Sequence, residues 1–170
     1  LYQLGLLQLT DSISRWIPAN PNINGNVTVR QLLNHTSGID DYCSAPNWYS
    51  SVTSGAGQLK MWQPEETLTS FVHAPYFAPG MGYQYSNTNF VLLGMIIKAV
   101  TGQSVSSQMQ THLFTPLQLT RTFLGAEMPL TGDTAHVWTN MYTGATDLTA
   151  QVMSTGGLSS SWTCGAVVAT

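Results

Sequence analysis

Residues 79–102, PGMGYQYSNTNFVLLGMIIKAVTG, join a loop to a helix and decide the fold of the chain. The first half carries turn-forming proline and glycine residues, followed by the polar run Tyr85-Ser86-Asn87. The second half is apolar on nearly every face, and Lys98 is its only charged residue. A helix of this composition belongs in a core, because no face of it suits water. We therefore expect a buried helix whose first turn lies at the mouth of a loop.

Both ends of this helix carry residues with known terminal preferences. Asn87 or Thr88 can cap its N-terminus, and Gly102 suits the left-handed conformation that ends many helices. About 14 residues at ~1.5 Å each give roughly 21 Å, which is too short to cross a bilayer. If Asn87 is the cap, its replacement by alanine should cost roughly 0.5–2 kcal/mol of stability.

The composition restricts the class of protein. Of the 170 residues, 43% are hydrophobic and only 8% are charged, which suits one globular domain with a substantial core. The net charge of −3 gives no electrostatic basis for binding nucleic acid or an anionic membrane surface. We expect no nucleic-acid partner and no membrane-spanning segment. The low charge favours an extracytoplasmic location, secreted or periplasmic.

The cysteines and histidines give no sign of a metal site, so we expect neither a metal nor a cofactor. Cys43 and Cys164 are too few for a zinc site or a disulfide framework. They are either two separate thiols, which we favour, or one disulfide. The four histidines lie in different segments without the spacing of metal ligands: His35, His73, His112 and His136. We interpret His35-Thr36-Ser37-Gly38 as a helix end with a glycine stop, not as a catalytic histidine motif.

Shorter elements are expected on either side of the central helix. Helices are predicted from Asp11 to Trp16, from a Thr28/Gln31 capping box to about residue 34, from Pro64 to His73, and from Ser104 to Leu113. Residues 39–62 show no sustained period and are expected to form a long loop, with Trp48 or Tyr49 partly exposed at the rim of a cleft. Residues 120–124 should be extended, and a buried strand or helix is expected over 162–168.

Four stretches, in this order along the chain, together resemble one enzyme family. They are VTVRQLLNHTSGIDDY (27–42), PGMGYQYSNTNFVLLGMIIKAVTGQSV (79–105), LFTPLQLTRTF (113–123) and SWTCGAVVAT (161–170). They are similar to the serine D-alanyl-D-alanine carboxypeptidases and class C β-lactamases, a family of penicillin-recognising hydrolases that includes esterases. The Y-S-N form of the tyrosine motif is closer to the carboxypeptidase and esterase branch than to the true lactamases.

The resemblance implies a mainly α chain, the helical part of a β-lactamase/DD-peptidase-like α/β+α fold. In this family a Ser-x-x-Lys nucleophile motif opens a long helix, and a third motif, His-x-Gly or Lys-Thr-Gly, lies on a strand of the α/β domain. Neither motif occurs in this sequence, where Gly57 and Met95 stand three residues before the two lysines. We expect residues 1–170 to be a single helical-rich domain cut from a larger catalytic domain. The nucleophile is then expected upstream of Leu1, and most of the α/β domain is missing.

The resemblance also implies roles for three residues. Tyr85 corresponds to the catalytic relay that handles the serine proton and the leaving nitrogen, and Asn87 to the amide that orients the substrate's side-chain carbonyl. Trp162 resembles an aromatic residue that lines the substrate cleft. The phenol of tyrosine has a pKa of about 10, so only about one molecule in a thousand is ionised at pH 7. Without the lysine of the absent motif, we expect Tyr85 to be an ordinary phenol.

Two functions stay open at this point. The first is part of a serine acyl-transfer hydrolase whose parent protein acts on a D-Ala-D-Ala peptide, a β-lactam or an ester through a serine acyl-enzyme. The second is a non-catalytic binding module of the same fold. The intact Y-x-N favours the enzyme, although the 170-residue chain alone is expected to be inactive. An apolar face left without its partner domain would also promote self-association.

Overall fold

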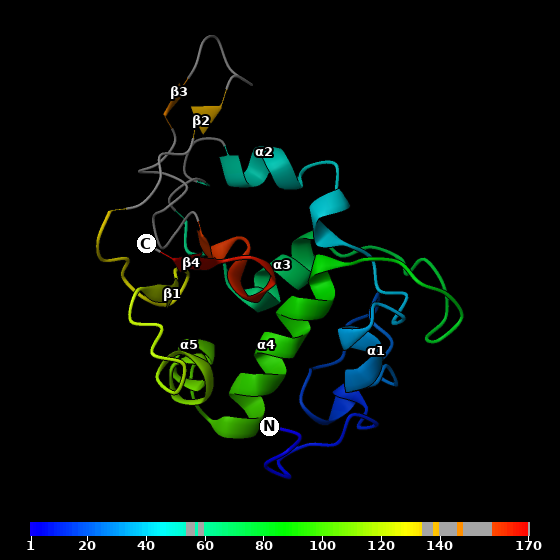
Figure 1. The fold of residues 1–170 in the computed structure, drawn as a ribbon. Coiled ribbons are helices and arrows are strands. Elements are labelled where there is room, and N and C mark those ends of the chain that lie inside the picture. The colour runs from blue at the N-terminus through cyan, green and yellow to red at the C-terminus, as the bar shows by residue number, and fades with distance from the viewer. Residues whose placement is uncertain (54–56, 58–59, 134–137, 140–145, 148–157, 170) are drawn as a thin grey trace. The chain divides into compact units, whose positions relative to one another are not determined.

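The computed structural model describes the chain except for residues 54–56, 58–59, 134–137, 140–145, 148–157 and 170 (Figure 1). The chain divides into two compact units. The first unit consists of Leu1–Tyr49 with Pro64–Val105, and the second of Ser50–Gln63 with Ser106–Thr170. The expectation of a single domain stays a prediction.

The first unit is built around one long helix, α4. Its elements are the 3-10 helices η1 (Ile13–Arg15) and η2 (Tyr42–Ser44) and the α-helices α1 (Val29–Leu33), α3 (Pro64–Phe71) and α4 (Asn87–Thr101). α4 contacts α1, α3 and η2, and it runs through the middle of these elements (Figure 1). Its buried apolar side chains are those of Val91, Leu92, Met95 and Ile96. The predicted core helix is therefore confirmed over its first turns, whereas Lys98 and Ala99 near its end are exposed.

The N-terminus of α4 differs from the prediction. Ser86 is the N-cap residue, and no side-chain hydrogen bond caps the helix, so the expectation of an Asn87 or Thr88 cap is wrong. The hydroxyls of Ser86 and Thr88 instead donate to the Asp40 carbonyl, at 3.1 and 2.6 Å. These hydroxyls therefore bind a distant segment of the chain and do not cap the backbone N–H groups of their own helix.

Several local predictions are confirmed. The Thr28 hydroxyl accepts from the Gln31 N–H at 3.3 Å, and the Gln31 side chain accepts from the Thr28 N–H at 3.0 Å, which completes the capping box of α1. Pro64 is the first residue of α3. Gly102 ends α4 in the left-handed conformation, with φ 68°, and its N–H donates to the Lys98 carbonyl.

Other local predictions differ from the structure. Asp11 does not cap a helix, because its carboxylate accepts from the Gln8 N–H at 2.8 Å and pairs with Arg15 at 2.6 Å. Part of the predicted 39–62 loop is helical, since η2 and α2 (Trp48–Thr53) form within it. Tyr49 is 45% exposed, which confirms the expected exposure of one loop aromatic.

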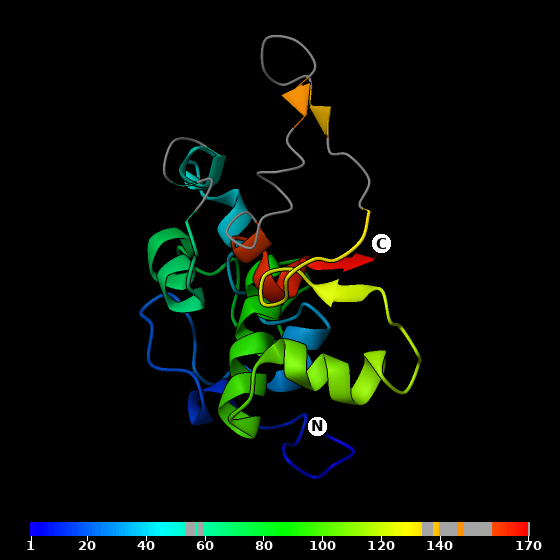
Figure 2. The same ribbon diagram turned by 90° about the vertical axis from the view of Figure 1, so that its left-hand side faces the viewer.

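The second unit combines short helices with two-stranded sheets. It contains α5 (Val105–Met109, which starts at the last residue of the first unit), a π-helical turn (Gln110–Phe114), β1 (Thr122–Leu124), β2 (Trp138–Thr139), β3 (Thr146–Asp147), η5 (Trp162–Cys164) and β4 (Val167–Ala169). β1 and β4 lie side by side (Figure 2) and pair antiparallel, with Phe123 opposite Val168. β2 pairs with β3. The extended segment predicted at 120–124 is confirmed for Thr122–Leu124, whereas residues 120 and 121 lie in a turn. The segment at 162–168 forms a 3-10 turn and a strand, but Val167 of that strand is exposed.

Two further observations concern the chain as a whole. Cys43 and Cys164, both among the described residues, carry thiols rather than a disulfide, as favoured from the sequence.

In the part of the chain that the structure describes, no single helix is long and apolar enough to cross a bilayer. α4 and the helical segment after it pass that test only when they are taken together across a bend.

Gly38 has a different role from the predicted helix stop. α1 ends with Asn34 as its C-cap, and His35 takes the left-handed conformation with φ 58°. Gly38 itself has φ 75°, and a Cβ atom on it would overlap the Phe77 carbonyl. The backbone at 76 lies directly against Gly38, because the Tyr76 N–H donates to the Gly38 carbonyl at 2.8 Å. Glycine is therefore required by close backbone approach.

We predict that Gly38→Ala destabilises the protein by roughly 3–5 kcal/mol, because it combines a left-handed alanine with a backbone overlap. Gly102→Ala is the matched control, since φ at Gly102 is 68° and nothing lies within 4 Å of its added Cβ. The control should cost only about 1–2 kcal/mol. Urea unfolding of the two variants measures the difference, and equal losses would contradict the close approach at Phe77.

Candidate active site

Tyr85 and Asn87 lie together at the start of α4. The Tyr85 hydroxyl donates to Asn87 Oδ1 at 3.0 Å. Tyr85 is 48% exposed and Asn87 is half-buried, so a phenol and an amide form a polar pair that a small molecule can reach. The structure thus brings together the two residues that the tyrosine motif singled out.

Asp41 is the next member of this group. Its carboxylate accepts from Asn87 Nδ2, with 3.0 Å to Oδ2 and 3.3 Å to Oδ1. Asp41 Oδ1 also accepts from the Cys43 N–H at 3.1 Å, which caps η2. The Asp41 N–H donates to the Tyr76 hydroxyl at 3.3 Å. A short row of hydrogen bonds therefore runs from the carboxylate through the amide to the phenol.

His35 supports the ring of Tyr85. The two ring centroids are 4.5 Å apart and the planes are tilted by 37°. His35 Nδ1 accepts from the Ser86 N–H at 3.3 Å and lies 3.2 Å from Asn89 Nδ2. Because two donors face Nδ1, the ring in this arrangement carries its proton on Nε2. His35 thus contributes to the site by holding the Tyr85 ring and the backbone next to it.

A buried pair lies behind the exposed one. Asn89 is fully buried, and its Oδ1 accepts from the Ser37 hydroxyl at 2.7 Å. The Ser37 oxygen in turn accepts from the Ile39 N–H at 3.1 Å. The orientation of the Asn89 amide follows, since its oxygen faces the serine and its nitrogen faces His35.

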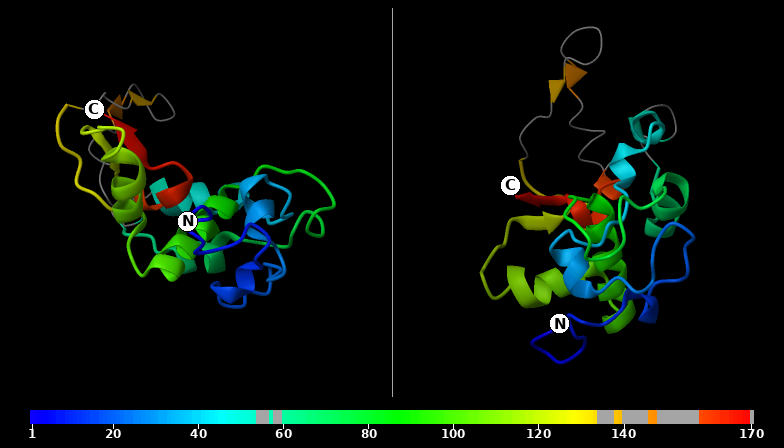
Figure 3. Two further views of the ribbon diagram at one scale, coloured as in Figure 1. Left: turned by 60° about the horizontal axis from the view of Figure 1, so that its bottom comes forward. Right: turned by 90° about the vertical axis from the view of Figure 1, so that its right-hand side faces the viewer.

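The loop between α3 and α4 returns along residues 35–38 before the helix begins (Figure 3). Backbone hydrogen bonds join Gln84 to His35 at 3.1 Å, Gly80 to Thr36 at 2.8 Å, and Tyr76 to Gly38 at 2.8 Å. These bonds set the path of the chain that leads into Tyr85. The position of the exposed phenol is consequently fixed by backbone as well as by side chains.

Trp162, the third predicted site residue, lies in the second unit. It is 7% exposed, and its indole N–H donates to Glu127 Oε1 at 2.8 Å. Glu127 Oε2 accepts from the Ser106 N–H at 2.8 Å, so one carboxylate joins η5 to the first turn of α5. Trp162 has φ 33°, in the left-handed region that bulky residues rarely adopt. The predicted role of Trp162 in lining a substrate cleft stays a prediction.

Sequence reasoning did not single out Asp41 or Asn89, and it gave His35 only a helix-ending role. A signal for Asp41 was present, because two adjacent acids, Asp40 and Asp41, stand out in a chain with only 8% charged residues. Asn89 gave no comparable signal, since a polar residue in the first turn of a helix is ordinary.

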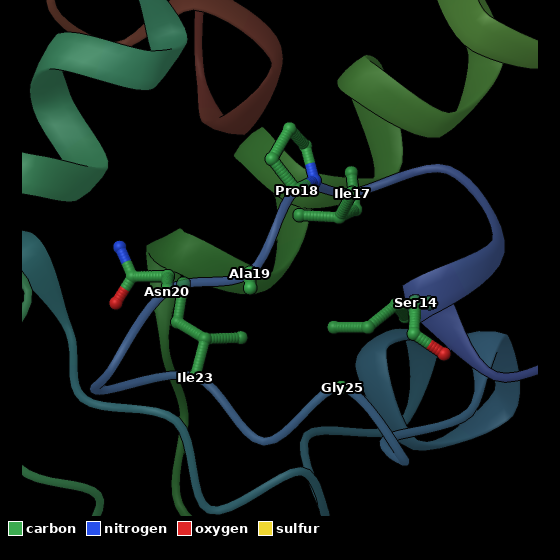
Figure 4. Close-up of a pocket in the computed structure, with 8 residues that line it drawn as sticks. Ser14, Ile17, Pro18, Ala19, Asn20, Ile23 and Gly25 are labelled. Atoms are coloured by element: carbon green, nitrogen blue, oxygen red, sulfur yellow. The ribbon is translucent and has the colours of Figure 1, made fainter.

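A separate hollow of ≈ 230 Å³ lies in the first unit (Figure 4). Its lining is mainly apolar, with Ile13, Ile17, Pro18 and Ile23, and it contains none of the residues around Tyr85. No group of three His, Cys, Asp or Glu side chains within the described ranges could hold a metal ion. This hollow therefore does not include the residues around Tyr85.

Comparisons with known proteins place this site in a family context. The family model described as Beta-lactamase matches residues 1–168. A penicillin-binding protein of Bacillus subtilis (strain 168) is 36% identical over 124 residues, which cover 72% of this chain and 26% of that protein.

Two solved structures are similar over most of the chain. The D-amino acid amidase of Ochrobactrum anthropi SV3, complexed with L-phenylalanine amide, has a TM-score of 0.79 and 31% identity, and the match covers 99% of this chain and 46% of that one. The D-stereospecific amidohydrolase of a Streptomyces species has a TM-score of 0.75 and 29% identity, with 91% and 50% covered. The chain thus spans about a quarter of the length of that curated relative and about half of the solved ones.

We predict that Asn89→Ala destabilises the protein more than Asn87→Ala. The first change leaves the Ser37 hydroxyl and the His35 ring without their buried partner and should cost about 2–4 kcal/mol. The second removes hydrogen bonds at a half-exposed position and should cost about 1 kcal/mol or less. Urea unfolding midpoints of this asparagine pair test the prediction. A larger loss for Asn87→Ala would mean that the exposed pair, not the buried one, carries the stability of this region.

Proposed function

The chain belongs to the β-lactamase family, and we propose that it is part of a serine acyl-transfer hydrolase that works through a serine acyl-enzyme. The substrates proposed for the whole protein are small molecules or peptides: a D-Ala-D-Ala peptide, a β-lactam, or a related ester or amide. We also propose an extracytoplasmic location and residues 1–170 as a single domain of the larger catalytic domain. These proposals combine family membership with the chemistry at the start of α4.

The observation that carries the proposal is the 3.0 Å hydrogen bond between the Tyr85 hydroxyl and Asn87 Oδ1. A phenol can pass a proton to and from neighbouring oxygen or nitrogen atoms, and an amide can bind a substrate carbonyl through an N–H. Both groups are accessible, and the surrounding hydrogen bonds hold them in place. Such preorganisation favours catalysis over loose binding.

In the proposed reaction, a serine hydroxyl of the parent protein attacks the substrate carbonyl. Tyr85 relays a proton: its phenol oxygen accepts the serine proton as the phenol's own proton passes to the leaving nitrogen or oxygen. Asn87 Nδ2 binds a second carbonyl of the substrate. Water then releases the acyl group and restores the serine hydroxyl. The 170-residue sequence contains no Ser-x-x-Lys, so we propose that the nucleophile and its lysine belong to another part of the parent protein.

We predict that the parent protein is acylated by a fluorescent penicillin and that Tyr85→Phe slows this acylation by about 10²- to 10⁴-fold, the range for losing a proton-transfer group. The change removes one oxygen from a residue that is 48% exposed, so the fold should be kept. Tyr83→Phe is the matched control, because Tyr83 is 69% exposed and two residues away along the same loop. Gel fluorescence against time gives the rates.

The outcomes separate the two candidate functions. Equal slowing by Tyr83→Phe and Tyr85→Phe would remove Tyr85 from the proposed mechanism. A parent protein that binds the penicillin reversibly, without an adduct in its intact mass, would be a non-catalytic binding module of the same fold.

We predict that the 170-residue chain made alone forms no adduct with the same penicillin. Acylation needs an activated hydroxyl and an oxyanion hole, and the sequence supplies no lysine three residues after a serine to activate one. Intact-mass measurement after incubation, with the parent protein as the positive control, tests this. A stoichiometric adduct would show that these residues carry their own nucleophile.

A further inference from the structure

We infer that Asp41 is a positioning residue that fixes the orientation of the Asn87 amide, an inference that rests on the proposed function. The juxtaposition is direct, because Asn87 Nδ2 lies 3.0 and 3.3 Å from the two Asp41 carboxylate oxygens. Asp41 binds the nitrogen of the Asn87 amide and the Tyr85 hydroxyl binds its oxygen, so Asn87 lies between the carboxylate and the phenol.

An asparagine amide has two orientations of nearly equal shape, related by a half-turn of the terminal group. In the observed one, Nδ2 faces the carboxylate and Oδ1 accepts from the Tyr85 hydroxyl. The opposite orientation would place Oδ1 against the Asp41 carboxylate, which has no proton to donate when ionised. A carboxylate at position 41 therefore selects one orientation, whereas an apolar side chain there would select neither.

The selected orientation leaves Asn87 ready for a substrate carbonyl. One N–H directed between the two carboxylate oxygens accounts for both distances to Asp41. The second N–H of the same group remains available to bind a carbonyl. Hydrogen bonds in a row also polarise one another, so donation to the charged Asp41 carboxylate makes Asn87 Oδ1 a stronger acceptor for the Tyr85 hydroxyl.

Asp41 is itself held in place. Its carboxylate accepts from the Cys43 N–H and its own N–H donates to the Tyr76 hydroxyl. Among the residues that the structure describes, no basic side chain forms an ion pair with Asp41. The Asn87 amide is thus the side-chain donor to this carboxylate.

The test compares two esters of the same leaving group in the full-length parent protein. The p-nitrophenyl ester of N-acetyl-D-alanine carries a second carbonyl for Asn87, whereas p-nitrophenyl acetate has none. Asp41→Ala should lower kcat/KM for the first ester by about 10- to 100-fold and for the second by less than about 3-fold. Asp41→Asn keeps one acceptor oxygen and should give an intermediate loss. Glu65→Gln, the same kind of change at an exposed acid, is the control.

A double-mutant cycle with Asn87→Ala makes the test specific. If Asp41 acts through Asn87, adding Asp41→Ala to Asn87→Ala should change kcat/KM for the first ester by less than about 3-fold. Equal losses on both esters, or fully additive losses in the cycle, would overturn the positioning role. A wild-type protein that hydrolyses neither ester and is not acylated by penicillin would instead overturn the proposed function.

The orientation itself can be measured without activity. In the wild-type protein, one Asn87 side-chain N–H resonance should lie downfield in a ¹H–¹⁵N spectrum, because it donates to a carboxylate. That shift should disappear in Asp41→Ala and stay in Glu65→Gln. An Asn87 resonance that Asp41→Ala leaves unchanged would overturn the inference, whatever the kinetics show.

Discussion

The carbonyl of Asp40 is the point on which the first unit depends. It accepts hydrogen bonds from the Ser86 and Thr88 hydroxyls, so it joins the residues after α1 to the first turn of α4. Thr88 Oγ1 also accepts from the Tyr42 N–H at 3.0 Å, and all these groups are buried. A buried polar group left without a partner costs more than a bond contributes. Residues 40–42 and 86–88 are therefore fixed against each other, and this fixes the position of Tyr85, the residue before Ser86.

Patterns that act within a few residues of the chain could be predicted from the sequence. The capping box at Thr28 and Gln31, the glycine that ends α4, and the proline that opens α3 depend only on neighbouring backbone groups. The apolar run of α4 likewise predicts burial by itself. Tyr85, at the end of the loop, and Asn87, the first residue of α4, are only two residues apart, so their closeness at the surface also follows from the sequence.

Contacts between distant segments could not be predicted in this way. The cap of α4 was missed because Ser86 and Thr88 donate to a carbonyl some 46 residues away. The role of Gly38 was missed for the same reason, since only the approach of Phe77 makes a glycine necessary there. α2 was missed because its residues show no apolar period, and none of them is buried in the structure.

Two asparagines two residues apart divide the work at the start of α4. Side chains two residues apart in an α-helix point in directions about 200° apart, so Asn87 and Asn89 face different surroundings. Asn89 faces inward, where Ser37 and His35 satisfy its amide and hold the 35–41 segment. Asn87 faces Asp41 and Tyr85, which bind the two ends of its amide. The buried amide thus holds the segment that carries Asp41, and the proposed role of Asn87 requires such support, because a group that meets a substrate cannot also be fully enclosed.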